Sequence, residues 1–145
     1  AGPPLFRLFH WGSEVDVIRQ LLHRPDQLRL VIDAHRPHRG ADAPQEGVSV
    51  EVIDVATLTP LDFDTIKESM QKTGRCVIVH EAPKTAGFGA EIAARLAEEC
   101  IYDLLAPVER VTAYDVHTPL YRLEMKQMPS TAQIVAAAKR TLAAS

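Results

Sequence analysis

The chain contains 145 residues, 46% of them hydrophobic, and is therefore long enough for one compact domain that buries roughly 70% of its unfolded surface. Its 16 basic and 19 acidic residues give a net charge of -3 and form no basic block, which argues against a nucleic-acid partner. The apolar stretches are shorter than the ~18 residues of a membrane span, and no cleavable leader is recognisable. We therefore expect a single soluble, cytoplasmic domain over residues 1–145, without a membrane partner.

The spacing of cysteine and histidine does not favour a metal site or a disulfide. Cys76 lies in an apolar run and Cys100 in a predicted helix, which fits neither a CxxC metal clip nor a disulfide framework. Two buried thiols in a reducing compartment are the simpler interpretation. His35 and His38 lie near one another, and a surface loop accounts for them better than a metal site does.

The first third of the chain predicts one strand, one helix and a segment without a clear pattern. Residues 5–11 end at a glycine, which suits a short strand before a turn. Ser13 can cap a helix that runs to about residue 23. Residues 25–47 contain LRLVIDA, which suits a strand, and then a polar stretch rich in proline and glycine. We assign no structure to 25–47, which could be an insertion or a disordered loop.

The next two elements have clearer boundaries. Residues 48–58 carry valine and isoleucine on both faces, which is typical of a strand covered on both sides. Asp62 can cap a helix over residues 63–74, and Gly74 supplies its C-terminal stop. The pattern therefore predicts a strand followed by an amphipathic helix.

A second strand and the strongest helical pattern follow. Residues 75–83 (RCVIVHEAP) predict a buried strand, residues 84–89 (KTAGFG) a loop, and the helix after it should end before Pro107. Apolar residues recur every four positions along this helix: Ile92, Leu96, Cys100 and Leu104. Ion pairs are expected between residues four apart on another face: Glu91, Arg95 and Glu99.

The last third predicts a strand and a closing helix. Residues 108–114 (VERVTAY) suit a strand, and residues 130–144 suit a helix capped by Ser130 or Thr131. Strands thus alternate with helices along the chain. This alternation favours an α/β fold with a mostly parallel sheet between two helix layers.

Four sequence blocks carry a resemblance to a known family. They are residues 49–75, 77–100, 106–115 and 117–142. Together they resemble the C-terminal domain of the beta subunit of thiamine-diphosphate-dependent 2-oxo acid dehydrogenases. The HEAP motif, the Gly-Phe loop and a helix ending in EEC are most similar to the branched-chain type, 2-oxoisovalerate dehydrogenase. Residues 25–46 depart from the family pattern.

The resemblance implies a transketolase C-terminal-like domain, a three-layer α/β/α sandwich around a mixed, mostly parallel sheet of about five strands, one of them antiparallel. In the family, alpha and beta subunits form a heterotetramer that decarboxylates a branched-chain 2-oxo acid on thiamine diphosphate and magnesium. The acyl group then passes to a lipoyl arm of the acyltransferase. The share of this domain would be assembly with the alpha subunit and a second beta subunit, and docking of the acyltransferase's subunit-binding domain.

The chain lacks the motif by which such enzymes hold their coenzyme. Thiamine diphosphate needs a divalent metal with oxygen ligands and an activating glutamate, and the metal motif is Gly-Asp-Gly followed by paired asparagines. This sequence has no Gly-Asp-Gly and no asparagine. We therefore expect no catalytic residue, cofactor or metal in this domain, and place thiamine diphosphate and magnesium elsewhere in the parent enzyme.

A set of residues around the second strand and the following loop is the candidate interface: His80, Glu81, Pro83, Gly87, Phe88 and Gly89. A histidine beside a carboxylate at a strand end could carry protons, although capping the sheet edge or reaching across a subunit interface is the favoured interpretation. The two glycines could expose amides to a phosphate. Close packing of loop against sheet, with Phe88 filling an apolar gap, is favoured instead.

Acidic residues near the end of the long helix are the candidate docking surface: Glu98, Glu99, Asp103 and Glu109. They are either an ordinary solvated face or a surface for the small basic subunit-binding domain of the acyltransferase, whose docking complementary charge would orient. Two further alternatives stay open. The chain could come from a pyruvate or acetoin dehydrogenase beta subunit, or it could be an independent α/β ligand-binding module.

Overall fold

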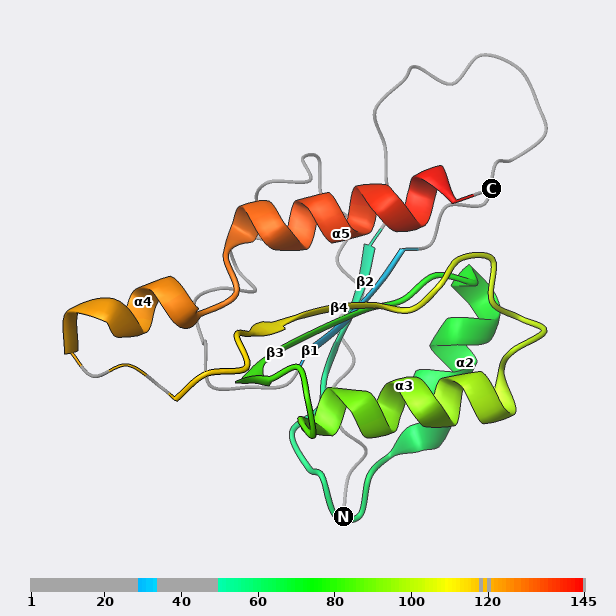
Figure 1. The fold of residues 1–145 in the computed structure, drawn as a ribbon. Helices are drawn as coiled ribbons and strands as arrows, with labels where there is room; N and C mark the ends of the chain where they lie inside the picture. The colour runs from blue at the N-terminus through cyan, green and yellow to red at the C-terminus, as the bar shows by residue number, and fades with distance from the viewer. Residues whose placement is uncertain (1–28, 34–49, 118, 120, 145) are drawn as a thin grey trace.

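The computed structural model describes residues 29–33, 50–117, 119 and 121–144 (Figure 1). The predicted strand at 5–11 and helix at 13–23 lie outside these ranges. Within the segment that we left unassigned, strand β1 covers Arg29–Asp33. None of the helices in the described part is long and apolar enough to cross a membrane.

Four described strands form one mixed sheet in the order β2-β1-β3-β4. Strand β2 covers Val50–Asp54, β3 covers Val77–Pro83 and β4 covers Glu109–Ala113. Strands β3 and β4 are parallel, whereas β1 is antiparallel to both β2 and β3. The strands β2, β3 and β4 therefore share one direction and β1 opposes them, in agreement with a mostly parallel sheet. The fifth predicted strand is not among the described residues.

Strand β3 is buried on both of its faces, as its uninterrupted apolar sequence predicts. Cys76, just before the strand, and Ile78 belong to a core cluster with α2 and α3, whereas Val77 packs with Val111 of β4 and Ile134 of α5. Figure 1 accordingly shows α5 on one side of the sheet and α2 and α3 on the other. Helices therefore cover both faces of the sheet.

Helix α2 covers Phe63–Thr73, and both of its predicted ends are confirmed. The Asp62 side chain accepts a hydrogen bond from the Thr65 amide at 3.3 Å, which satisfies one of the first free N–H groups. Gly74 ends the helix in the left-handed conformation, with φ of 68°, and its amide donates to the Met70 carbonyl at 2.8 Å. A Cβ atom at Gly74 would lie 2.5 Å from Cγ of Leu105.

Helix α3 covers Phe88–Glu99, so the predicted extension toward Pro107 is wrong. Ile92, Leu96 and Cys100 are buried as their spacing predicts, but Cys100 already leaves the helical conformation, with φ of -127°. The chain then turns back, because the Leu105 amide donates to the Gly74 carbonyl at 2.8 Å before β4 begins. The helix also starts at Phe88, inside the predicted loop.

Only one of the expected ion pairs of α3 forms. Arg95 pairs with Glu99 at 3.4 Å, and its guanidinium carbon lies 3.8 Å from the centre of the Phe63 ring. A pair between Glu91 and Arg95 is not found in the described part of the chain. The contact with the aromatic face of Phe63 and the pair with Glu99 place the Arg95 guanidinium toward α2.

Helix α5 covers Thr131–Ala143 and starts in a capping box between Ser130 and Gln133. Ser130 is therefore the cap, which settles the alternative with Thr131. The 3-10 turn Tyr121–Leu123 and the short helix α4, Glu124–Gln127, precede it. Neither was predicted, because one helical turn is too short to show an apolar period.

The substitution Gly74→Ala is expected to lower the free energy of unfolding by about 2 kcal/mol, since the residue has a positive φ and the added methyl group meets Leu105. Urea unfolding followed by circular dichroism measures the loss. Leu105 is an exposed side chain, so adding Leu105→Ala should restore the part of the loss that is due to the clash. A loss under about 0.5 kcal/mol for Gly74→Ala would contradict the strain at this position.

Candidate functional site

The carboxyl ends of the parallel strands β2, β3 and β4 meet at one edge of the sheet, where open α/β folds usually present functional groups. Pro83 at the end of β3 is paired in register with Ala113 at the end of β4. The three segments that leave this edge are residues 55–62, 84–87 and 114–117. The candidate interface residues belong to the middle segment and to the elements that flank it.

The imidazole of His80 lies directly beneath the first turn of α3. The side chain is only 5% exposed. A Cβ atom at Gly87 would lie 2.6 Å from Cε1 of the ring, and one at Gly89 would lie 2.5 Å from Nε2. These distances leave no room for a side chain at either position, so the glycines allow the helix to start in contact with the histidine.

The environment of His80 favours its neutral form. Burial lowers the pKa of His80, and the positive charge of Arg110 lowers it further. Neither ring nitrogen has a hydrogen-bond partner among the residues that the structure describes. At neutral pH the ring is therefore an uncharged packing group. This environment does not favour the alternative of a proton carrier poised near pH 7.

Two contacts tie the loop before α3 to β4 and to the segment that follows it. The amide and hydroxyl of Thr85 donate to the two carboxylate oxygens of Asp115, at 2.9 and 2.7 Å. These hydrogen bonds hold the pKa of Asp115 below its usual range. Arg110 also donates to the carbonyl oxygen of Lys84 at 3.0 Å. The loop is thus fixed at its side by β4 and from below by His80.

A cavity of about 660 Å³ opens between the segment after β2 and the first half of α3. Most of its wall is apolar, and the apolar side chains are Leu58, Pro60, Leu61, Ala86, Phe88 and Ala90. Phe88 is half-buried there and contacts the core. Of the other candidate residues, Pro83 is exposed at the end of β3, whereas Glu81 is partly buried and makes contacts of its own.

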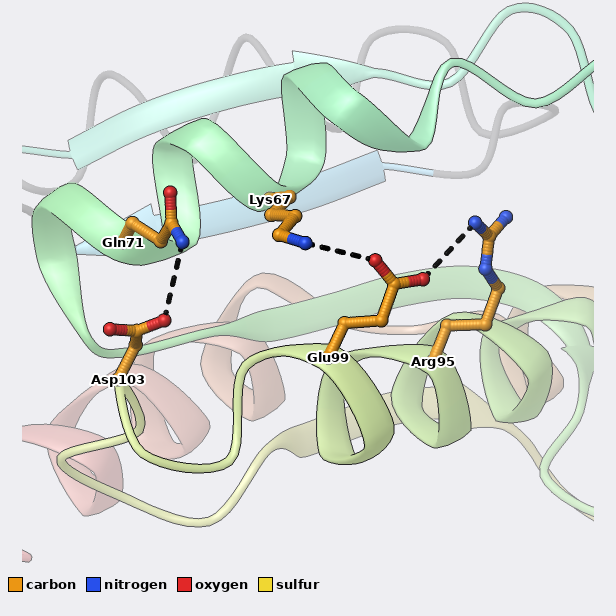
Figure 2. Close-up of polar contacts among 5 residues, drawn as sticks. All are labelled: Lys67, Gln71, Arg95, Glu99 and Asp103. Atoms are coloured by element: carbon orange, nitrogen blue, oxygen red, sulfur yellow. Dashed lines mark hydrogen bonds and ion pairs between the residues drawn. The ribbon is translucent and has the colours of Figure 1, made fainter.

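Three of the four acidic candidates, Glu98, Glu99 and Asp103, lie at or just after the C-terminal end of α3, and Figure 2 shows the contacts of Glu99 and Asp103. Glu99 pairs with Lys67 at 3.1 Å and with Arg95, and Asp103 accepts a hydrogen bond from Gln71 at 3.4 Å. The contacts with Lys67 lower the pKa of Glu99. Glu98 is exposed. These contacts, which we call the polar seam, join the end of α3 to α2. They partly neutralise the negative charge of Glu98, Glu99 and Asp103.

Glu109, the fourth acidic candidate, is separated from the other three. It lies at the start of β4 and forms two hydrogen bonds with Arg140 of α5, at 3.0 and 2.9 Å. Because α5 and α3 cover opposite faces of the sheet (Figure 1), Glu109 is directed to the α5 layer. The sequence predicted one acidic cluster, but the fold separates Glu109 from the other three residues.

Sequence reasoning missed the residues that hold the loop and the apolar groups near both edges. Thr85, Arg110 and Asp115 gave no pattern, because the residues of each contact lie about 30 positions apart. Large exposed apolar side chains follow α3 and β4: Ile101, Tyr102, Leu105, Tyr114, Val116 and Leu123. Single exposed apolar residues are common in any sequence, and only the fold places Tyr114 and Val116 just after β4, beside the end of β3.

Metal-binding groups are not found in the described part of the chain, where no set of three or more His, Cys, Asp or Glu side chains could hold an ion. His35 and His38 lie outside that part. Cys76 and Cys100 are both buried free thiols. Burial raises the pKa of each, which makes them poor nucleophiles.

Gly89→Ala is expected to lower the free energy of unfolding by about 1–3 kcal/mol, because the methyl group would overlap the His80 ring. The same substitution in a His80→Ala background should cost much less, since the smaller side chain leaves room. A double-mutant cycle measured by urea unfolding gives the coupling between the two positions. Equal losses in both backgrounds would show that the ring and the glycine are not in contact.

Comparison with known proteins agrees with this fold. Residues 41–134 match the family described as Transketolase, C-terminal domain. The 3-methyl-2-oxobutanoate dehydrogenase subunit beta of Mycobacterium tuberculosis is 47% identical over 98 residues, which cover 68% of this chain and 28% of that protein. The 2-oxoisovalerate dehydrogenase subunit beta of Pseudomonas aeruginosa is 46% identical over 102 residues, 70% of this chain and 29% of that protein.

A pyruvate dehydrogenase subunit is similar to the same extent. The E1 component subunit beta of Staphylococcus epidermidis is 47% identical over 98 residues, 68% of this chain and 30% of that protein. The chain thus spans less than a third of the length of these relatives. Together with the family match over residues 41–134 and the helix-covered, mostly parallel sheet, these similarities show that the chain belongs to the transketolase C-terminal domain family, in the form found in beta subunits of 2-oxo acid dehydrogenases.

Proposed function

We propose that this chain is the assembly and docking domain of a branched-chain 2-oxo acid dehydrogenase beta subunit. The parent enzyme would perform the oxidative decarboxylation of branched-chain 2-oxo acids on thiamine diphosphate. The observation that carries this proposal is the 46–47% identity to named dehydrogenase beta subunits over about two thirds of the chain. We also propose that the whole domain is a three-layer α/β/α sandwich whose sheet has a fifth strand in addition to the four described ones.

The described residues do not fit a thiamine diphosphate site. Its diphosphate would need a magnesium ion with oxygen ligands, whereas the carboxylates of Glu99, Glu109 and Asp115 are each engaged by neighbours within the chain. The sequence also contains no asparagine. We therefore assign no catalytic step to these residues and place the coenzyme and its metal in other parts of a cytoplasmic parent enzyme.

The sheet edge at the ends of β3 and β4 is our candidate for the interface with the alpha subunit and a second beta subunit. Its support is the apolar cavity wall, which includes Phe88, and the exposed side chains of Tyr114 and Val116 nearby. The loop beside them is held by Asp115 and His80, so it is already ordered before a partner binds. A preordered surface loses less conformational entropy on association.

The opposite end of α3 is our candidate for docking the acyltransferase. Glu98 and Asp103 lie beside the exposed side chains of Ile101 and Tyr102, and the latter is 100% exposed. An apolar centre with acidic neighbours fits a small basic domain, whose approach the charges would accelerate and orient. Glu99 and Glu109 contribute less to this field, because each is paired within the chain.

Charge reversal tests the docking surface. In the full-length beta subunit, Glu98→Lys is expected to slow association with the acyltransferase's subunit-binding domain several-fold at low salt, and the difference should shrink at high salt. Stopped-flow fluorescence measures the association rate constant. Glu68→Lys, on the exposed side of α2, makes the same charge change elsewhere and should have little effect. If the two variants are equally slowed, or neither is, the docking assignment is wrong.

Substrate choice separates the branched-chain proposal from the pyruvate alternative, which the similar Staphylococcus epidermidis subunit supports. The full-length beta subunit, reconstituted with its alpha subunit and thiamine diphosphate, should give a kcat/KM for 3-methyl-2-oxobutanoate at least tenfold above that for pyruvate. The difference arises because the two acids differ by two methylene equivalents in an apolar pocket. Steady-state assays with an artificial electron acceptor measure both values. A preference for pyruvate would establish the alternative.

A further inference from the structure

We propose that His80 is a positioning residue that holds the loop Lys84–Gly89 and the start of α3 in place only while its imidazole is uncharged. Acidification would then loosen this loop. The inference rests on the proposed function in that the loop borders the proposed subunit interface, and it adds a means of regulation that the interface itself does not require.

The His80 ring supports the first turn of α3 by direct contact. His80 lies on the same side of β3 as Ile78, because a Cβ atom at Gly89 would contact both side chains, at 2.5 Å from Nε2 and 3.0 Å from the Ile78 Cγ2. The ring thus fills the space under Gly87 and Gly89, where the first turn of α3 begins. Since interiors are closely packed, a ring that leaves this position must displace the turn above it.

The electrostatic potential around the His80 ring is positive. The N-terminus of α3 presents the positive end of the helix dipole, and Arg110 of β4 contributes a full positive charge that disfavours the charged imidazole. Glu91 is exposed and lines the cavity at the start of α3, and Glu109 is at the opposite end of β4, where it pairs with Arg140. Glu81 is the next residue along β3, and successive side chains of a strand point to opposite faces of the sheet.

A protonated His80 would therefore meet positive potential with no carboxylate from α3 or β4 directed at it among the described residues. It would also add a second buried N–H donor to the one that a neutral imidazole already carries, and neither ring nitrogen has an acceptor among the residues that the structure describes. Both effects vanish when the loop opens and water reaches the ring. Protonation consequently favours the open loop.

The pH window follows from the sign of the shift. In the closed state the pKa of His80 is lowered below 6.5, so the closed state binds fewer protons than the open one. The stabilisation by the neutral ring is complete above pH 6.5 and is lost as the pH falls through that value toward the lowered pKa. The carboxylate of Asp115, which accepts the two hydrogen bonds from Thr85, does not titrate in this pH range, because these hydrogen bonds hold its pKa below its usual value.

The consequence for function lies in the cavity wall. Ala86, Gly87 and Phe88 form part of that wall and belong to the segment that His80 supports. An opening of this segment would remove the ordered surface that we assign to the subunit interface. Mild acidity should therefore weaken association at this edge and leave the polar seam between α2 and α3 intact.

Two measurements on the wild-type 145-residue chain test the switch directly. Proton–carbon NMR of the histidine rings between pH 7.5 and 5 should show that His80 becomes half protonated only below pH ~6.5, the ordinary pKa of a histidine side chain. Hydrogen–deuterium exchange, corrected for intrinsic rates, should show amides 88–90 losing protection by about tenfold for each pKa unit between the two states. Amides of α2 should keep theirs. Half-protonation of His80 at or above pH ~6.5, or loop amides unaffected by its titration, would overturn the proposal.

Variants identify the residue responsible. His80→Gln cannot be protonated, so the pH dependence of exchange at amides 88–90 should disappear, whereas the matched control His117→Gln should leave it unchanged. Arg110→Gln removes the nearby positive charge and should make the acid-induced loss of protection smaller, because the charged ring is then better tolerated in the closed state. This variant also loses the hydrogen bond to the Lys84 carbonyl, so the change of exchange with pH is compared and not the absolute exchange rate. Persistence of the pH dependence in His80→Gln, or an undiminished pH dependence in Arg110→Gln, contradicts the switch.

The switch and the proposed interface can fail separately. Exchange and NMR on the chain require no partner, so they decide the behaviour of His80 alone. Association of the full-length beta subunit with its alpha subunit, measured by analytical ultracentrifugation at pH 7.5, decides the interface. If the loop loosens with acid but Phe88→Asp leaves association unchanged, the interface assignment fails and the switch stands.

Discussion

The burial of β3 on both faces is the constraint that places the other described elements. Ile78 packs under α2 and α3, while Val77 packs against Val111 and α5. A strand with apolar side chains in both directions must be covered by two helix layers, because exposing either face would cost about 25 cal/mol for each Å² of apolar surface. The order of the layers, and hence the position of both sheet edges, follows from this strand.

His80 extends this arrangement to the edge of the sheet. Its side chain is buried on the same face of β3 as Ile78. Unlike Ile78 it is polar, and it packs against the start of α3. The glycines at 87 and 89 let the backbone approach that ring. The same compact contact that fixes the loop therefore also leaves a titratable group without hydrogen-bond partners among the described residues, which couples packing to protonation at this edge.

The two ends of α3 differ in their chemistry. Near its start, apolar side chains and a cavity lie beside a loop fixed by Thr85 and Asp115. At its other end, charged and polar side chains join α3 to α2 (Figure 2). Exposed ion pairs such as Lys67–Glu99 add little stability, so their main effect is to partly neutralise the acidic group and leave Glu98 as a more effective charge. A domain of this kind can present two different surfaces for two different partners.

The sequence by itself determined the local structure. Asp62, Gly74 and Ser130 mark helix ends, since capping depends only on residues within one turn, and the apolar runs of β2 and β3 indicate coverage on both faces. The family resemblance, too, depends on contiguous blocks of sequence. The end of α3 was predicted too far along the chain, because the spacing of Leu104 continues the helical period after the backbone has turned toward Gly74.

Only the tertiary structure decided which residues meet. The contacts of Thr85 with Asp115 and of Glu109 with Arg140 join positions 30 and 31 residues apart, and the periodicity of a single sequence carries no information about such pairs. For the same reason the sequence could not separate Glu109 from Glu98. Nor could it place the His80 ring under Gly87 and Gly89, because that contact depends on how far the loop returns over its own strand.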